Sequence, residues 1–194
     1  MTTVGVLALQ GDFAEHAQAL LALGLTPREV RLPRELQGLD GLILPGGEST
    51  TFSRLMEEFA LIEPLKQFAR SGKPTWGTCA GLIALATKVE GRKEPILGLL
   101  DVTVERNAYG RQTESFEAAL PVKDLGSAPF HAIFIRAPVI KAVGAKATVV
   151  ASYQGLPVAV RQGNLFGTSF HPELTGDTRF HAYFMTLAKV PARA

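Results

Sequence analysis

Cys79, the only cysteine in the sequence, is flanked by Gly77-Thr78 and Ala80-Gly81, where a strand is expected to turn sharply into a helix. Residues 73–78 end in β-prone side chains, and residues 82–86 are apolar and helix-forming. Small neighbours at such a junction permit a strained turn that exposes a nucleophile, as in the G-x-S-x-G elbow. The other interpretation is a buried cysteine that packs as a small hydrophobic residue. The pentapeptide alone leaves both open.

His171 and Glu173 can supply the base and the acid that a catalytic thiol requires. Pro172 restricts His171 to an extended conformation, and in an extended segment residues two apart face the same side. The carboxylate of Glu173 would then orient the imidazole while its other nitrogen faces Cys79, as in a catalytic triad. The remaining histidines are interpreted as packing or surface residues: His16, His131 and His181.

The loop formed by Gly46, Gly47, Glu48 and Ser49 follows a predicted strand and precedes a predicted helix. Paired glycines let backbone N–H groups approach a ligand closely and build an oxyanion hole. An ordinary turn with Ser49 as the helix N-cap is the alternative. A phosphate-binding loop is disfavoured because no lysine follows at the required spacing. Together with a thiol and a His-x-Glu pair, the oxyanion interpretation is preferred.

The length, composition and charge of the sequence exclude several classes of protein. A chain of 194 residues with 46% hydrophobic content can bury a full core, which excludes a disordered protein. One cysteine forms no internal disulfide, and no leader-like apolar segment follows Met1, so we expect a cytoplasmic protein. No apolar run approaches the roughly 20 residues that span a bilayer, so no membrane association is expected. The net charge of +2 shows no basic stripe for nucleic acid.

The first half alternates predicted strands with predicted helices. Strands are expected at residues 4–9, 29–32, 41–44 and in the segment leading to Cys79. The first helix begins at a capping box of Asp12 and Glu15 and ends at Gly24. A second helical region runs to about Arg70 with a break at residues 63–64. Ligands of parallel sheets bind beyond the carboxyl ends of the strands, which is where both the paired glycines and the cysteine are expected.

The second half shows alternating patterns typical of antiparallel strands. They cover residues 100–106, 114–118, 133–136, 148–153 and 157–161, with a hairpin turn at 154–156, a strand from about 164 toward His171, and a last helix at 178–189 before a frayed end. We therefore predict a three-layer α/β fold in one domain, residues 1–194. Its central sheet is mostly parallel and flanked by helices, with an antiparallel β extension in the second half.

The sequence resembles the class I (triad) glutamine amidotransferases over essentially its whole length. Within that superfamily it is similar to the branch that serves pyridoxal 5′-phosphate synthases. The resemblance rests on residues 5–12 with Glu15-His16, 44–50, 76–82 and 170–174. It implies a flavodoxin-like, glutamine amidotransferase-like fold and hydrolysis of L-glutamine to L-glutamate and ammonia.

The resemblance also implies roles for individual residues. Cys79, His171 and Glu173 would be the catalytic triad, backbone N–H groups at Gly47 and Ala80 would stabilise the oxyanion, and Gln10 would take part in activation. Glutamine recognition would fall to these residues: Gly47, Glu48, Ser49, Arg106, Ile135 and Arg136. No cofactor and no metal ion are expected. From the residues alone, Arg106 and Arg136 would be strand residues that point to solvent.

The resemblance further implies a partner, a (β/α)₈-barrel synthase subunit in a large hetero-oligomer that uses the ammonia. Three alternatives remain. The acceptor enzyme could be a different synthase. The chain could be a cysteine hydrolase of related fold, although those often place the histidine directly beside the cysteine, where Ala80 stands here. It could also be a non-catalytic binding module, which an intact Cys, His and Glu disfavours.

Overall fold

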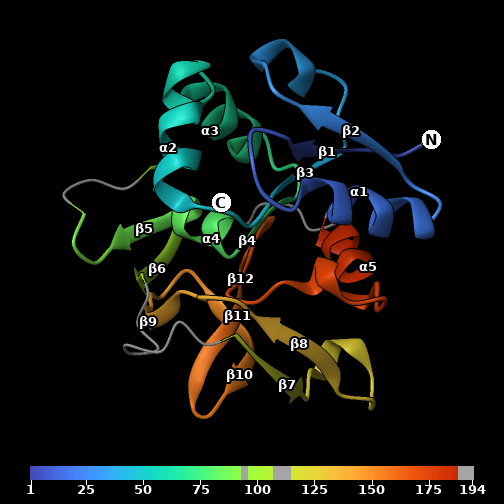
Figure 1. The fold of residues 1–194 in the computed structure, drawn as a ribbon, viewed down its shortest axis with the longest axis vertical. Helices are drawn as coiled ribbons and strands as arrows, with labels where there is room; N and C mark the ends of the chain where they lie inside the picture. Colours follow the sequence, from blue (N-terminus) through green and yellow to red (C-terminus); the bar gives the residue numbers. More distant parts are fainter. Residues whose placement is uncertain (93–95, 107–114, 188–194) are drawn as a thin grey trace.

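The computed structural model describes residues 1–92, 96–106 and 115–187 (Figure 1). The helices are α1 (Phe13–Ala22), α2 (Ser49–Glu58), α3 (Ile62–Arg70), α4 (Ala80–Leu85) and α5 (Arg179–Thr186), with 3₁₀ turns η1 (Pro33–Leu36), η2 (Lys123–Leu125) and η3 (Pro172–Leu174). The strands of the N-terminal half are β1 (Thr3–Leu7), β2 (Thr26–Val30), β3 (Gly41–Leu44), β4 (Thr75–Thr78) and β5 (Ala86–Val89). Those that follow are β6 (Leu100–Glu105), β7 (Phe116–Leu120), β8 (Phe130–Phe134), β9 (Val139–Val143), β10 (Thr148–Tyr153), β11 (Leu156–Gln162) and β12 (Leu165–Thr168).

The main sheet places four segments that carry predicted site residues at the edge where its parallel strands end. Across the described part of the chain it has seven strands in the order β10-β11-β12-β4-β3-β1-β2. Strands β12, β4, β3, β1 and β2 are parallel, and β11 and β10 continue the sheet antiparallel. The carboxyl ends of β1, β3, β4 and β12 therefore lead side by side into Gln10, the paired glycines, Cys79 and His171. This edge is the position that doubly wound folds use for ligands.

Both faces of the sheet are covered, because its strands carry apolar side chains on both sides. Leu42 and Leu44 of β3 pack on one side with residues of α2, α3 and α4, while Ile43 packs on the other with residues of α1 and α5. The strands β5, β6 and β9 form a small sheet that extends the first core. The hairpin of β7 and β8 extends the second. The predicted three-layer fold with an antiparallel extension is confirmed.

Several local predictions differ from the structure. The helical region after the glycine loop breaks at residues 59–61, not at 63–64, because Pro64 falls in the first turn of α3, where its missing N–H costs no bond. The apolar run after Cys79 is helical only to Leu85 and then forms the unpredicted strand β5. Strand β9 was also not predicted. Glu114 and the ends of the last predicted helix and of the chain, residues 188–194, lie outside the described residues.

The His-Pro-Glu segment is not extended as predicted. Pro172–Leu174 forms the 3₁₀ turn η3, and proline at its first position has a φ that suits the start of a helical turn. No helix within the described ranges has the length and apolar character needed to cross a membrane.

Candidate active site

Cys79 lies at the sharp junction of β4 and α4 that the sequence predicts. Its φ of 48° and ψ of −101° are unusual for a residue with a side chain, and its backbone N–H donates to the carbonyl of Thr168 at 2.8 Å. A side chain on Gly77 would collide with the backbone of Gly81, and one on Gly81 would collide with the carbonyl oxygen of Leu44. The two flanking glycines therefore let α4 pack directly on the strands, which fixes the strained turn.

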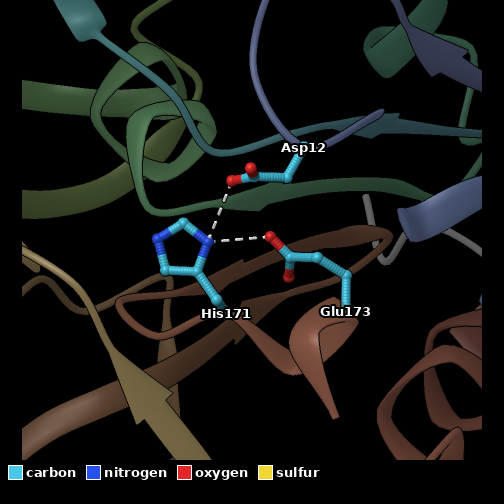
Figure 2. A group of neighbouring side chains, drawn as sticks. All are labelled: Asp12, His171 and Glu173. Carbon is cyan, nitrogen blue, oxygen red and sulfur yellow. Dashed lines mark hydrogen bonds and ion pairs between the residues drawn. The ribbon is translucent and has the colours of Figure 1, made fainter. Parts of the chain in front are cut away.

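His171 and Glu173 form the pair that the sequence predicts, as Figure 2 shows. Nδ1 of His171 lies 2.8 Å from Oε1 of Glu173. Both residues are almost fully buried, and the backbone N–H of His171 donates to the carbonyl of Ile133 at 2.8 Å. The 3₁₀ turn places the carboxylate beside the ring by folding the chain back. The structure thus confirms the contact and corrects the geometry that produces it.

Asp12 is a site residue that the sequence analysis missed. It was interpreted as a helix cap, but it makes no side-chain capping hydrogen bond to α1. Its Oδ2 instead lies 3.3 Å from Nδ1 of His171, the same nitrogen that Glu173 contacts (Figure 2). An Asp at the start of a helix has the same sequence signature in either role, so only the position of His171 distinguishes them.

These contacts set the charge of the imidazole. Burial disfavours the charged form of His171, but hydrogen bonds with Asp12, with the thiol sulfur and with Glu173 outweigh burial and raise its pKa to about 12. The contact with His171 in turn lowers the pKa of Asp12. Burial raises the pKa of Glu173, and its bond to the imidazole opposes that rise. The site therefore favours an imidazolium whose Nδ1 contacts two carboxylates and whose ring also bonds to the sulfur.

The glycine loop is held by Gln10. The side-chain amide of Gln10 donates to the carbonyl of Glu48 and accepts from its backbone N–H, each at 3.3 Å. A side chain on Gly47, whose φ is 152°, would collide with that amide. A side chain on Gly46 would collide with the ring of His171. Both glycines are therefore needed for the close approach of this loop to its neighbours.

Glu48, and not Ser49, is the N-cap of α2. Its carboxylate accepts from the backbone N–H groups of Thr50 at 2.9 Å and Thr51 at 2.7 Å. These hydrogen bonds lower the pKa of Glu48 to about 2. Glutamate reaches these donors with its longer side chain, so the predicted turn has a different cap. Ser49 becomes the first residue of the helix.

A cavity of about 450 Å³ connects most of the predicted residues. Its lining includes nine of the eleven residues that the sequence analysis nominated: Gln10, Gly47, Glu48, Ser49, Cys79, Arg106, Ile135, Arg136 and His171. Glu173 lies behind His171, and Ala80 is buried at the first position of α4. Asp12, Ile83 and Pro138 complete the lining. A cavity of this size suits a small molecule such as an amino acid.

Neither arginine is simply a strand residue that faces solvent. Arg106 follows β6, and its Nη2 lies 3.2 Å from Oγ1 of Thr50 and 3.8 Å from Oε1 of Glu48. Strand β8 ends at Phe134, so the prediction of a strand through Arg136 is wrong. Arg136 has a φ of 43°, and the resulting bend presents Ile135 and Arg136 to the cavity. A left-handed conformation of arginine leaves no sequence signature.

Three ligand atoms at the site are close enough to share a metal ion. Atoms of Asp12, His171 and Glu173 lie within 4.8 Å of one another. Metal binding would require Nδ1 of His171 to give up the proton that it shares with the two carboxylates. The cluster is fully explained by a charged imidazole and its acceptors, so we assign no metal to it.

Comparisons with known proteins agree with this geometry. A model of the SNO glutamine amidotransferase family matches residues 6–189. A protein of Herpetosiphon aurantiacus named pyridoxal 5′-phosphate synthase subunit PdxT is 56% identical over 189 residues, covering 95% of this chain and 100% of the relative. A protein of Geobacillus kaustophilus with the same name is 54% identical, covering 96% and 94%.

Solved structures with the same fold include a glutamine amidotransferase. A crystal structure of a glutamine amidotransferase superposes with a TM-score of 0.91 at 50% identity, covering 96% of this chain and 99% of that one. The structure of PurLQS from Thermotoga maritima superposes with a TM-score of 0.71 at 18% identity, covering 97% and 99%, and supports the fold alone.

Proposed function

The chain belongs to the SNO glutamine amidotransferase family, and from this premise we propose that it is the glutaminase subunit of a pyridoxal 5′-phosphate synthase. It hydrolyses L-glutamine to L-glutamate and ammonia. The observation that carries the proposal is the pair of His171 and Glu173 at 2.8 Å in a site shared with Cys79. A thiol, a base and an orienting acid are the components of nucleophilic amide hydrolysis.

In this mechanism Cys79 supplies the nucleophile and His171 carries the proton. With the imidazole protonated, the sulfur attacks the side-chain amide carbon of glutamine as a thiolate. The imidazolium gives its proton to the amide nitrogen, which leaves as ammonia, and a thioester remains on Cys79. Water then adds to the thioester and gives its proton to the imidazole. Glutamate departs, and the thiolate and imidazolium are restored.

Two backbone N–H groups are proposed to stabilise the tetrahedral oxyanion. Ala80 is the first residue of α4, and N–H groups in the first turn of a helix have no intrahelical acceptor. Gly47 lies across the cavity in the loop that Gln10 holds. Loss of one such donor typically costs about 3 kcal/mol of transition-state stabilisation.

Recognition of the α-amino acid end is proposed to use the charged groups of the cavity. An arginine binds a carboxylate through two parallel hydrogen bonds, so Arg106 and Arg136 suit the α-carboxylate of glutamine. Glu48 provides the negative charge that an ammonium group prefers. The full set proposed for glutamine binding is Gly47, Glu48, Ser49, Arg106, Ile135 and Arg136.

The ammonia is proposed to pass to a (β/α)₈-barrel synthase subunit within a large hetero-oligomer. Ammonia released into water near neutral pH is mostly protonated and loses its nucleophilicity, so direct transfer within a complex preserves its reactivity. The two relatives named as synthase subunits support this assignment. A reducing cytoplasm is the proposed location, because the catalytic thiol must remain free.

Replacement of the nucleophile tests the function. We expect Cys79→Ala to fold normally and to lose glutamine hydrolysis by several orders of magnitude, measured with the synthase partner present. A glutamine-like electrophile should label the parent protein at Cys79 and leave the variant unlabelled. Retention of more than about a tenth of parental turnover would rule out the thiol mechanism.

A further inference from the structure

His16 and His181 form a buried network directly behind the catalytic pair. Both imidazoles are fully buried, and Nδ1 of His16 lies 3.0 Å from Nε2 of His181. Nε2 of His16 lies 3.2 Å from Oγ1 of Thr78 and 3.5 Å from Oε2 of Glu173. The hydrogen bond between Glu173 and His171 uses the other carboxylate oxygen, Oε1 (Figure 2). The network therefore reaches the catalytic acid from its far side.

Burial keeps the two histidines neutral. It lowers the pKa of His16 well below its ordinary value, and the positive charge of His171 acts in the same direction. Burial also lowers the pKa of His181 to about 4. Each ring therefore carries a single N–H at neutral pH, and the short contact between them requires one donor and one acceptor.

Unpartnered atoms decide which ring donates. Among the described residues, Nδ1 of His181 has no hydrogen-bond partner. If His16 donated to His181, the proton of His181 would occupy Nδ1 as a buried N–H without an acceptor, and a lone pair of His16 would face the carboxylate. If His181 donates instead, only a lone pair is left unpaired, and the N–H of His16 points toward Thr78 and Glu173. Unpaired buried donors are the rarer and costlier case, so the second arrangement is favoured.

We propose that His16 is a positioning residue for catalysis: its neutral Nε2–H, fixed by His181, holds Oε2 of Glu173 and directs Oε1 to His171. The role rests on the proposed function, in which Glu173 orients the catalytic imidazole. Within the described ranges Oε2 of Glu173 makes no hydrogen bond, its carboxylate is completely buried, and Nε2 of His16 approaches it at 3.5 Å. A donor at this oxygen reduces the cost of keeping the carboxylate charged. It also restricts rotation of the carboxyl group.

The packing around His16 fixes its ring. Trp76 contacts both histidines edge-on, with ring centroids 5.6 Å from His16 and 4.9 Å from His181. Thr78 precedes Cys79 directly in the chain, so the same imidazole contacts the strand that delivers the nucleophile and the turn that delivers the acid. The titratable groups that contact the two buried histidines or the imidazole of His171 include Asp12, Cys79 and Glu173.

A pair of substitutions at His16 separates positioning from packing. His16→Gln can place an amide N–H near the site of Nε2, whereas His16→Leu fills similar space without a donor. With the synthase partner present, we expect His16→Leu to lower kcat by about ten- to a hundredfold, with little change in KM for glutamine. His16→Gln should recover most of that loss. His131→Leu, at an exposed histidine that contacts Glu117, is the matched control and should keep parental kcat.

The kcat of the His16 variants and the tautomer of His16 test the proposal independently. In the ¹⁵N spectrum of histidine-labelled parent protein, His16 should be a neutral Nε2–H tautomer. Parental kcat in a folded His16→Leu variant, equal losses in the Leu and Gln variants, or an Nδ1–H tautomer would each overturn the proposal. The tautomer decides the matter if His16→Leu does not fold. Activity of Cys79→Ala would instead contradict the proposed function, so the two failures are distinguishable.

Discussion

At the scale of single residues, the site depends on two carboxylates that share one imidazole. Glu173 is the closer and the buried partner, while Asp12 is about a third exposed and borders the cavity. Both favour the protonated ring. The consequence is that the imidazolium, and with it the proton needed by the departing ammonia, persists to high pH.

Asp12→Asn tests this electrostatic contribution. Since the pKa of His171 is raised, its proton is present below that pKa and is lost as the pH rises through it. Removal of one negative charge lowers the pKa of His171, so we expect the alkaline limb of kcat/KM to move about one pH unit lower. This shift is at the lower end of the usual range for the effect of a neighbouring charge on a pKa, because water screens the partly exposed Asp12. The measurement is a pH profile of glutamine hydrolysis by the complex.

Glu15→Gln is the matched control for Asp12→Asn, since it removes an exposed carboxylate from the first turn of the same helix. Its pH profile should coincide with that of the parent. Identical alkaline limbs in Asp12→Asn and in the parent would show that Asp12 does not act on His171.

Sequence reasoning at this scale identified residues whose chemical type is rare and missed those whose type is common. A single cysteine and a His-x-Glu pair define a triad in any fold that unites them. Asp12 fits a helix cap equally well, and His16 fits an amphipathic helix. Their roles depend on neighbours that follow more than a hundred residues later, and no local pattern specifies such a distance.

At the scale of elements, glycines determine how close the backbone segments of the site can approach. Gly81 lets α4 lie against β3, and Gly46 lets the loop after β3 lie against His171. The sequence predicted the strand-to-helix junction because flanking glycines mark it. It did not predict η3 or β5, because a short apolar or proline-containing run fits several local structures and tertiary packing selects one.

Gly81→Ala tests the packing of the elbow. A methyl group would collide with the carbonyl of Leu44, which is backbone and cannot rotate away. We expect about 2 kcal/mol or more of lost stability in urea unfolding, and reduced glutaminase activity because Cys79 moves with α4.

Gly176→Ala provides the comparison, because nothing lies within 4 Å of the added methyl group and the backbone there is not left-handed. Its stability should remain within about 0.5 kcal/mol of the parent. Equal effects of the two substitutions would argue against tight packing at the elbow.

At the scale of the whole molecule, the segment from Gln10 to Asp12 contacts both the glycine loop and His171. Gln10 holds the loop that bears Gly47, and Asp12 contacts His171. A partner that binds this segment would act together on the loop of Gly47, the proposed oxyanion donor, and on His171, the proposed base. This arrangement suits a glutaminase that should work only when an acceptor is present.

We therefore expect the isolated chain to be a weak glutaminase that the synthase subunit activates by about tenfold or more, which corresponds to about 1.4 kcal/mol. Gln10→Ala should impair association or activation while leaving the thermal unfolding curve nearly unchanged. The control is Gln67→Ala, at an exposed position of α3. Full activity of the purified chain alone, or no association with the barrel subunit in the presence of glutamine, would contradict this prediction.

The position of β12 has a consequence for the time at which activity arises. This strand is made late, yet it occupies the interior of the main sheet beside β4, and it leads to His171. The two buried histidines behind the site are 165 residues apart. A chain still being translated therefore contains the proposed nucleophile, Cys79, long before it contains the proposed base, His171. We expect unfinished chains on the ribosome that lack β12 to release no ammonia, so that hydrolysis begins only after the segment that bears His171 has been made.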